Sequence, residues 1–305
     1  MTSEQTSRAM AVDRPGVLRL VERSLPQPGP GQARIRVRAA GVQPYDGAVV
    51  DGWAPPGAGS TPPIIPGNEF AGDVDALGEG VDGVEVGDAV LGFGQLGSYA
   101  EHLVVAAEQV TPKPESMSWR VAGGLTAGGQ TAHIALEMLE VGPGDVLLVL
   151  GAAGGVGQMA VQLARIAGAR VIGGARVAHH ERLRSLGVEP VDTATGFADR
   201  MRDLAEGEVD AVIDGVGGEL LDETLGLVKD RARVITLVEH GRAPELGIRT
   251  TENRRSAERL AELAALQAAG DLDVRIRRTF PLEQAAHALQ ALREGGGGKI
   301  VLTVD

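Results

Sequence analysis

The stretch Val146–Gly168, VLLVLGAAGGVGQMAVQLARIAG, decides the fold of this chain. It begins with a short apolar run, Val146–Leu150, which passes into a glycine-rich turn and then into an amphipathic helix. A second apolar strand, Arg170–Ala175, follows the helix. Strand, glycine turn and helix in this order form the phosphate-binding start of a Rossmann unit. Glycines let the backbone approach a pyrophosphate closely, and the free N–H groups at the helix start attract the anion.

The glycine-rich turn supplies the first candidate cofactor-binding residues. Its context, between a strand and a helix with a second strand following, distinguishes it from an isolated glycine pattern. A tight turn without a ligand is the alternative interpretation. The candidates in this turn are Gly151, Ala153, Gly154, Gly155, Val156 and Gly157.

The end of the second strand predicts which dinucleotide binds. An NAD site usually has an acidic residue there that binds the ribose 2′-hydroxyl. Here no acid precedes Glu181, and Arg176 stands where the acid would be. Its guanidinium is suited to a 2′-phosphate, with His179 and His180 as candidate helpers, so the sequence favours NADPH over NADH. The alternative is that Arg176 is an ordinary exposed loop arginine.

The remainder of the middle segment continues to alternate between strand and helix. Such alternation predicts a parallel sheet covered by helices on both faces, with its ligand across the carboxyl ends of the strands. The expected strands are Glu189–Val191, Asp210–Asp214 and Ala232–Val238, and the expected helices are His179–Leu186, Phe197–Ala205 and Glu219–Leu227.

The flanking segments have different patterns. The first is rich in short alternating strands, and Trp53–Pro66, dense in Pro and Gly, is expected to form a surface loop beside a site. The expected strands there are Ala33–Ala39, Glu69–Leu77, Asp88–Leu91 and Ser98–Val105, followed by a helix over Val121–Leu139. The last segment is expected to hold helices over Asn253–Ala269 and Leu282–Glu294 and strands over Asp273–Thr279 and Lys299–Val304.

Composition indicates a cytoplasmic enzyme acting on a small molecule. The chain has 305 residues, no cysteine and a net charge of −12. The missing cysteines exclude disulfides and thiolate chemistry, and the negative charge argues against nucleic acid or an anionic membrane as a partner. No apolar run is long enough to span a bilayer. The start, MTSEQTSRAM, lacks a signal-peptide core and is expected to be frayed.

Motifs distributed from about Leu18 to Val304 carry a resemblance to a known family. The chain resembles the medium-chain dehydrogenase/reductase superfamily, and more closely its zinc-independent quinone oxidoreductase (zeta-crystallin-like) branch. The motifs are AAGVQPYD at 39–46, PGNEFAG at 66–72, VGDAV at 86–90, GSYAEH at 97–102, TA at 131–132, GAAGGVG at 151–157, DGVGG at 214–218 and GKIVL at 298–302.

The resemblance implies an α/β fold in which a doubly wound Rossmann sheet is inserted in a GroES-like, β-rich catalytic domain. The expected domains are residues 1–120 with 257–305 for the GroES-like part and 121–256 for the Rossmann part, with the cofactor in the cleft. A homodimer is also implied, often formed by edge strands of the Rossmann domain, and Ile248–Thr251 is the candidate edge.

Departures from the family pattern predict a site without zinc. The zinc-dependent branch has a cysteine at the position of Gln43 and a histidine at that of Asn68, and it carries a cysteine-rich structural lobe that this chain lacks. The six histidines form no cluster with ligand spacing, so no metal is expected. The quinone-reductase branch usually has Asn where this chain has Gln43. The longer amide keeps a hydrogen-bonding group with shifted geometry. The branch's loop tyrosines are also missing.

The expected reaction is hydride transfer from NADPH to a quinone or an α,β-unsaturated carbonyl, with negative charge developing on the acceptor oxygen. Gln43 is the first candidate for contacting the substrate or the nicotinamide ribose. Asp46 is a second candidate, although an acid here is also suited to capping a helix. Trp53 is a candidate apolar wall over a flat acceptor, with loop packing as its alternative.

Further cofactor contacts are expected from the resemblance and from the predicted strand ends. Thr131 is expected near the nicotinamide, and its alternative role is a helix threonine bonded to its own backbone. Lys299 is expected to meet a phosphate or a carboxylate, with a surface salt bridge as its alternative. Glu69 is expected to be structural. The candidates are Thr131, Val216, Gly217, Leu237 and Lys299.

Two other functions compete with quinone reduction. An enoyl-thioester or other 2-alkene reductase uses the same scaffold, and the sequence separates it poorly from a quinone reductase. A non-catalytic NADPH-binding protein, such as a redox sensor, would bind the cofactor without turning over any acceptor. The missing zinc ligands disfavour an alcohol dehydrogenase.

Overall fold

The computed structural model describes residues 5–58 and 61–304. The chain divides into two compact units, Met1–Ala127 with Ser256–Asp305, and Gly128–Arg255. The first division falls inside the helix α2 (Trp119–Met138), seven residues beyond the expected boundary at 120, because this helix continues from one unit into the other. The second falls at residues 255 and 256.

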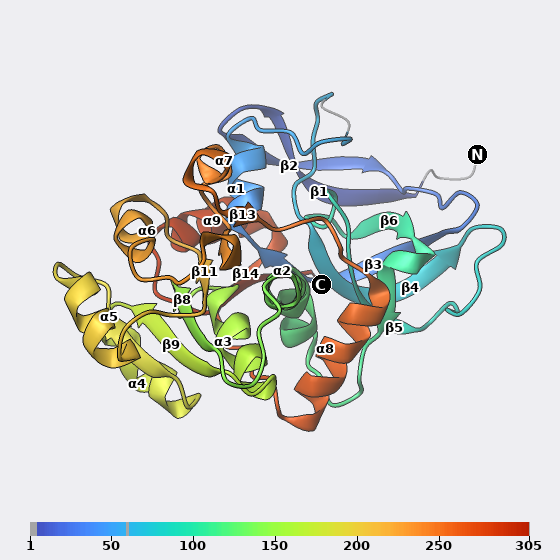
Figure 1. Cartoon of the computed structure of the whole chain (residues 1–305). Coiled ribbons are helices and arrows are strands. Elements are labelled where there is room, and N and C mark those ends of the chain that lie inside the picture. The colour runs from blue at the N-terminus through green and yellow to red at the C-terminus, as the bar shows by residue number, and fades with distance from the viewer. Residues whose placement is uncertain (1–4, 59–60, 305) are drawn as a thin grey trace. The chain divides into compact units, whose positions relative to one another are not determined.

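The second unit is built on a six-stranded parallel sheet in the order β10-β9-β8-β11-β12-β13 (Figure 1). From β8 the chain adds β9 and β10 on one side and then β11, β12 and β13 on the other. The position between β8 and β11 is therefore the switch point, where doubly wound sheets bind their ligands. The strands are β8 (Val146–Leu150), β9 (Arg170–Ala175), β10 (Glu189–Asp192), β11 (Ala211–Asp214), β12 (Val234–Thr236) and β13 (Arg249–Thr250).

Helices connect these strands and cover the sheet. The predicted strand–helix alternation is confirmed, with α6 ending three residues earlier than expected. The central strand β8 is buried because helices cover both faces of a parallel sheet: Leu147, Leu148 and Val149 are all fully buried. The helices are α3 (Gly157–Ile166), α4 (His180–Ser185), α5 (Phe197–Ala205), α6 (Gly218–Thr224) and α7 (Ala243–Leu246), with 3₁₀ turns at Val177–His179 and Arg231–Arg233.

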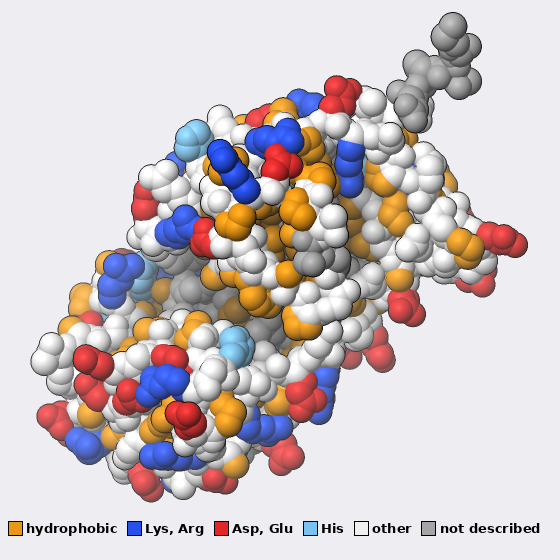
Figure 2. Space-filling model, turned by 90° about the horizontal axis from the view of Figure 1, so that it is seen from above, with side chains coloured by type: hydrophobic (Ala, Val, Ile, Leu, Met, Phe, Trp, Pro, Cys, Tyr) orange, Lys and Arg blue, Asp and Glu red, His pale blue; other side chains and the backbone are white. Residues whose placement is uncertain are grey.

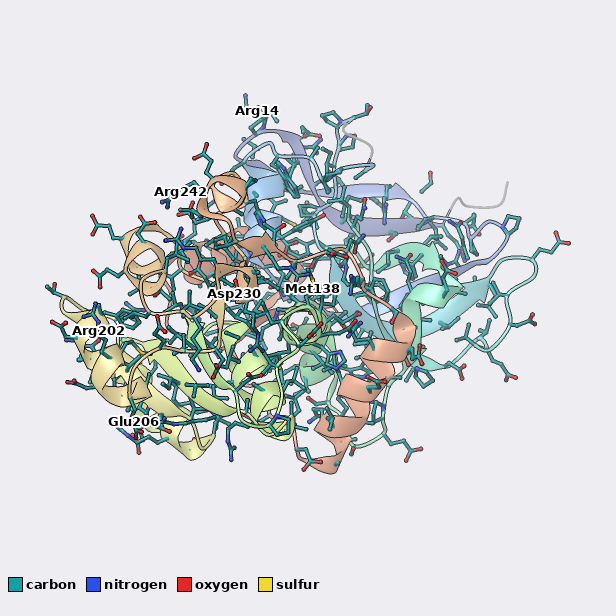
Figure 3. The ribbon with its side chains drawn as sticks, viewed as in Figure 1. Arg14, Met138, Arg202, Glu206, Asp230 and Arg242 are labelled. Carbon is teal, nitrogen blue, oxygen red and sulfur yellow. The ribbon has the colours of Figure 1, made fainter. Side chains whose placement is uncertain are left out.

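Helix α5 illustrates how the amphipathic pattern sets packing. Phe197 and Met201 are buried in the core of the second unit, one helical turn apart. Arg202 lies on the exposed side (Figure 3). The helix ends at Glu206, which adopts a left-handed backbone conformation. Burial of one face therefore fixes the helix against β10.

The first unit is dominated by a seven-stranded sheet in the order β14-β15-β3-β4-β5-β7, with β6 pairing separately with β3, and by the hairpin β1-β2. The long strand β3 is central because it pairs with β15, β4 and β6. The strands are β1 (Thr6–Arg14), β2 (Val17–Ser24), β3 (Gln32–Val42), β4 (Glu69–Leu77), β5 (Ala89–Phe93), β6 (His102–Ala106), β7 (Val110–Pro112), β14 (Ile276–Pro281) and β15 (Lys299–Thr303).

The chain's last segment joins the same sheet, which explains why sequence positions far apart share one unit. Strand β15 pairs antiparallel with β3, so that Val301 faces Gly41. The remaining helices of this unit are α1 (Pro44–Val50), α8 (Ala257–Ala269) and α9 (Ala285–Arg293), with 3₁₀ turns at Ala107–Gln109 and Leu282–Gln284.

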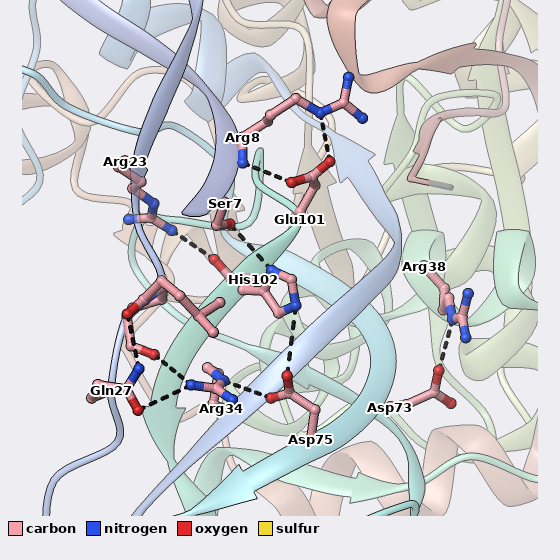
Figure 4. Close-up of polar contacts among 12 residues, drawn as sticks. Ser7, Arg8, Arg23, Gln27, Arg34, Arg38, Asp73, Asp75, Glu101 and His102 are labelled. Carbon is pink, nitrogen blue, oxygen red and sulfur yellow. Dashed lines mark hydrogen bonds and ion pairs between the residues drawn. The ribbon is translucent and has the colours of Figure 1, made fainter. Parts of the chain in front are cut away.

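A polar network joins several strands of the first unit (Figure 4). Arg34 Nε donates to Asp75 Oδ1 at 2.8 Å, joining β3 to β4. His102 Nε2 lies 3.6 Å from the second oxygen of Asp75, and its Nδ1 lies 3.2 Å from Ser7 Oγ on β1. Burial lowers the pKa of His102, which favours its neutral form in this network.

Two predictions about the first unit were wrong, and one helix was not predicted. The N-terminal stretch is not frayed from Thr6 onward, because it forms strand β1, whose residues Ala9 and Met10 are buried. The expected strand from Ser98 begins only at His102, the start of β6. The helix α1 was not expected. By contrast, the expected edge strand at 248–251 is confirmed as β13, at one edge of the parallel sheet.

The surface carries both signs of charge. Acidic and basic side chains are interspersed over the face shown in Figure 2. Several form ion pairs, such as Arg242 with Asp222 at 2.7 Å. Exposed pairs of this kind contribute little to stability. Within residues 5–58 and 61–304, no helix has both the length and the apolar character needed to cross a membrane.

Candidate functional site

The glycine turn after β8 has a backbone that only glycine permits at two positions. Gly151 has φ +74°, in the left-handed region. Its N–H and that of Ala152 both donate to the carbonyl oxygen of Gly174, at 3.0 and 3.1 Å, so the turn is fixed to β9. A Cβ on Gly157 would overlap the carbonyl oxygen of Gly151. The turn is therefore a tight and preorganised connection between strand and helix.

Helix α3 starts in a way that suits an anion. No side chain caps its N-terminus, so the first N–H groups are not satisfied by a capping residue. A Cβ on Gly128 would lie 2.6 Å from the carbonyl oxygen of Gly155, which shows how closely helix α2 approaches the turn. Glycine backbone, uncapped helix start and position at the carboxyl end of β8 fit the pyrophosphate of a dinucleotide.

The end of β9 presents Arg176 to solvent. The side chain is exposed, and within the described residues its guanidinium has no hydrogen-bond or ion-pair partner. His180 does not share this freedom, because its Nε2 lies 3.0 Å from the carbonyl oxygen of Ala175, where it donates a hydrogen bond to the strand end. If His180 assists Arg176 in binding a 2′-phosphate, it does so through its other ring nitrogen, Nδ1.

The neighbouring strand ends are organised by Asp214, the last residue of β11. Its Oδ1 accepts from the N–H groups of Val216 and Gly217, at 2.9 and 2.8 Å, and its Oδ2 accepts from Thr236 Oγ1 at 2.7 Å. Val216 is 49% exposed despite being apolar. Leu237, whose N–H donates to Asp214 O at 2.8 Å, is half-buried. These expected contact residues therefore line the same end of the sheet as the phosphate turn.

In the first unit, Gln43 and Asp46 lie at the start of α1, directly after β3. Asp46 Oδ2 accepts from the backbone N–H of Gln43 at 2.8 Å and from the Tyr99 hydroxyl at 2.9 Å. The capping role considered for Asp46 is confirmed, and Pro44 at the first helical position supports the same helix start. Asp46 is buried, so it lacks a direct path to solvent.

Burial makes Asp46 an unusual acid. It raises the pKa of the Asp46 carboxyl to about 7, against the opposing hydrogen bonds from Gln43 and Tyr99. Burial and the neighbouring Asp46 carboxylate also raise the pKa of Tyr99 well above its ordinary value, so the phenol stays protonated as a donor. The other Asp46 oxygen, Oδ1, has no partner among the described residues. With this pKa, the Asp46 carboxyl loses its proton near neutral pH.

A second buried carboxyl, Glu69, lies beside Gln43. Its Oε1 accepts from Lys299 Nζ at 2.7 Å and from the side-chain amide of Gln43, and its Oε2 accepts from the N–H of Ala127 at 2.7 Å. Glu69 is fully buried and Lys299 is 2% exposed. Lys299 thus has the expected carboxylate partner, whereas its interpretation as a surface salt bridge was wrong. Glu69 has the structural role expected of it.

Trp53 and Thr131 have more open surroundings. Trp53 is 45% exposed and its ring meets Tyr45 edge-on, with centroids 5.1 Å apart. This contact supports the loop-packing alternative while leaving an exposed aromatic face. Thr131 is half-buried on α2, and the described residues show no hydrogen bond from its hydroxyl to the helix backbone. The alternative role given to it, a self-bonded helix threonine, is therefore not what the structure contains.

The described residues contain no group of three or more His, Cys, Asp or Glu side chains arranged to hold a metal ion. Asn68 occupies the position of the zinc branch's histidine, is 7% exposed, and has no partner for its Oδ1 in the described part of the chain.

The sequence did not reveal that Lys299 pairs with Glu69 or that the Tyr99 hydroxyl donates to Asp46. Lys299 and Glu69 are 230 positions apart, so no local spacing reveals their pairing. One signal existed: a Cβ on Gly41 would overlap the Glu69 carboxylate, so a glycine inside this strand marks a close approach. Gly41, Gln43 and Glu69 all fall within the quoted family motifs.

A parallel sheet with a glycine turn that suits an anion, together with a separate β-rich unit holding buried polar side chains, is the architecture of dinucleotide-binding α/β proteins. Comparisons with known proteins agree. Residues 29–115 match the alcohol dehydrogenase GroES-like domain, and residues 186–302 match the zinc-binding dehydrogenase family. The chain belongs to the medium-chain dehydrogenase/reductase superfamily, whose dehydrogenases bind NAD(P).

Individual relatives show the extent of the similarity. The quinone oxidoreductase from Coxiella burnetii is 30% identical, with a TM-score of 0.87 over 99% of this chain and 100% of that one. The CurK enoyl reductase is 25% identical, with a TM-score of 0.86 over 98% and 99%. The polyketide synthase GfsB of Streptomyces halstedii is 34% identical over 90% of this chain, which spans only 5% of that protein.

Proposed function

We propose that this oxidoreductase transfers hydride from NADPH to a quinone or a similar conjugated carbonyl acceptor, without zinc. The observation that carries the proposal is the glycine turn after β8, with its uncapped helix start, in the same unit as the exposed cation Arg176. The turn suits the pyrophosphate common to NADH and NADPH. Arg176 adds a partner for the 2′-phosphate that only NADPH carries.

The chain's own residues have distinct roles in this proposal. When bound, NADPH supplies the hydride. Gly151–Gly157 hold the pyrophosphate, and Val216, Gly217 and Leu237 border the cofactor at the neighbouring strand ends. Gln43 contacts the acceptor or the nicotinamide ribose, and Trp53 offers its exposed face to a flat acceptor.

The absence of zinc in the proposed mechanism rests on the residues at the family's metal positions. Gln43 and Asn68 stand there, and neither amide is a customary zinc ligand. The Gln43 amide is also engaged by Glu69. Equilibration with zinc followed by elemental analysis of the washed protein tests this part, since a stoichiometric bound metal would contradict it.

A homodimer through β13 is part of the same proposal. Among the described residues this strand pairs only with β12, and its other edge is the one that a second copy would pair with. No nucleic acid or membrane partner is proposed. Sedimentation equilibrium distinguishes a dimer from a monomer directly.

The decisive experiment measures NADPH and NADH oxidation at 340 nm with a panel of quinones and enones. Rapid NADPH-dependent loss with a quinone would support the proposal. The matched variants are Arg176→Ala and Arg184→Ala, two exposed arginines of the same unit. We expect the first to weaken NADPH binding about tenfold or more while sparing NADH, and the second to change neither. Equal effects of Arg176→Ala on both cofactors would refute the 2′-phosphate role.

A second candidate is reduction of an enoyl thioester or another 2-alkene. The similarity to an enoyl reductase and to a polyketide synthase favours it. Turnover of enones or enoyl thioesters alone in the same panel would select this function. Tight NADPH binding without turnover of any acceptor would select a non-catalytic NADPH-binding protein instead.

A further inference from the structure

The orientation of the Gln43 side chain is determined by its surroundings in the first unit. Gln43 is 7% exposed and its amide nitrogen donates to Glu69 Oε1. A carboxylate paired with Lys299 accepts hydrogen bonds and has none to donate. It therefore selects the NH₂ end of the amide and turns the carbonyl oxygen of Gln43 away from Glu69.

Glu69 is itself held in one position. Lys299 Nζ and the N–H of Ala127 donate to its two oxygens, both at 2.7 Å. Strand register brings these groups together, because β4 and β15 both pair with β3 around Gly41. A side chain at Gly41 would overlap the carboxylate, so this position leaves room for Glu69.

The Gln43 backbone is fixed independently of its side chain. Asp46 accepts from the Gln43 N–H at 2.8 Å. The hydroxyl of Tyr99, in the loop before β6, also donates to Asp46, at 2.9 Å. The N–H of Asp46 donates to the main-chain oxygen of Gln43 at 3.1 Å, so this helix start does not depend on the side-chain oxygen of Gln43. Backbone and amide are thus both restrained, which is the condition for presenting one chosen atom to a ligand.

We propose that Glu69 and Lys299 are positioning residues that make the Gln43 carbonyl oxygen a hydrogen-bond acceptor for a hydroxyl group of the bound ligand. This proposal rests on the proposed function in one respect, that Gln43 contacts a ligand. It narrows the chemistry of that contact. A hydroxyl, such as a sugar hydroxyl, is the matching donor, whereas negative charge developing on the acceptor oxygen must be stabilised elsewhere.

The first test needs no turnover. Variants E69M/K299M remove both buried charges together with little change in volume, an exchange that buried ion pairs often tolerate. The probe is the side-chain amide signal of Gln43 in the cofactor-free protein, assigned by its loss in Q43M. We expect slow exchange of one amide proton with water in the unchanged protein and faster exchange in E69M/K299M. Identical exchange in both would overturn the positioning role.

The second test is a double-mutant cycle on kcat/KM with the best acceptor. We expect Q43M to cost about tenfold in the unchanged protein, the effect of one hydrogen bond, and less than about twofold in E69M/K299M. The same loss in both backgrounds would show that Glu69 and Lys299 act only structurally. If E69M/K299M does not fold, E69Q replaces it in both tests, with a smaller but same-direction change.

The two tests separate this proposal from the proposed function. If no quinone or enone is turned over, the proposed function fails, while the amide exchange still decides whether Glu69 orients Gln43. If turnover is present but Q43M is fully active, the contact between Gln43 and the ligand is refuted even where the amide is oriented. If Q43M is impaired, a panel of cofactor analogues lacking single ribose hydroxyls identifies the donor, because loss of that hydroxyl should lower kcat/KM in the unchanged protein and cause no further loss in Q43M.

Discussion

The buried carboxyl of Asp46 predicts a specific pH dependence of stability. Replacing it by asparagine keeps an oxygen that accepts from the Gln43 N–H and the Tyr99 hydroxyl, the two contacts that Asp46 makes at 2.8 and 2.9 Å. The substitution removes the titration of this side chain while keeping an acceptor for both contacts. Asp203→Asn, on the exposed side of α5, is the matched control because it makes the same chemical change at the surface.

The magnitude follows from the shift in pKa. The Asp46 carboxyl titrates at about 7 in the folded protein, against 3.8 for an unperturbed aspartate. Because the folded pKa is raised, this stabilising contribution is complete below pH 3.8 and is lost as the pH rises through about 7. Between those values each pH unit lowers the free energy of unfolding by about 1.4 kcal/mol, and the full shift corresponds to about 4 kcal/mol.

The assay is urea unfolding at pH 5, 6, 7 and 8, comparing the two variants with the unchanged protein. Between pH 5 and 7, we expect the free energy of unfolding to fall by about 2 to 3 kcal/mol less in Asp46→Asn than in the unchanged protein. Other titrating groups are common to all three proteins and cancel in the differences. A buried amide also adds a constant offset that leaves the slope unaffected. Parallel curves for Asp46→Asn and the unchanged protein would refute the reasoning.

Two further substitutions test close backbone approaches. Gly41→Ala should displace the Glu69 carboxylate and lower the free energy of unfolding by about 1 to 3 kcal/mol, as overpacking does, whereas Gly241→Ala, with nothing within 4 Å of the new Cβ, should change it little; equal thermal midpoints would contradict this. Gly157→Ala should push a methyl group against the carbonyl oxygen of Gly151 and weaken NADPH binding at least about tenfold by fluorescence titration, and unchanged affinity would show that the turn does not hold the pyrophosphate.

Local sequence predicted the second unit far better than the first. The strand, turn and helix of the proposed phosphate site depend on glycines and apolar residues that are close together in the sequence. The boundaries of β8 and β9 were therefore predicted correctly. Helix α1 was not predicted, although Pro44 and Asp46 are helix-start residues, because its seven residues are too few to show a helical period. Strand β1 was not predicted because it is held by its antiparallel pairing with β2, which the pattern of its own residues does not show.

The polar side chains of the first unit were harder to predict because their contacts depend on strand register. Lys299 meets Glu69 only once β15 and β4 have both paired with β3. Residue type alone left Lys299 with several alternatives, including phosphate and the surface. Lys299 is only 2% exposed and Glu69 is fully buried, and this burial excludes a surface salt bridge for Lys299.

The energetics of this buried pair support a role beyond stability. Removing Glu69 and Lys299 from water carries a desolvation cost that their attraction repays only with good geometry and further hydrogen bonds. Here those further bonds come from Ala127 and from the Gln43 amide. Two apolar side chains of similar volume would fill the same space at comparable stability, but neither would distinguish the two ends of an amide. The carboxylate makes that distinction, so the orientation of Gln43 is what the pair provides that packing alone does not.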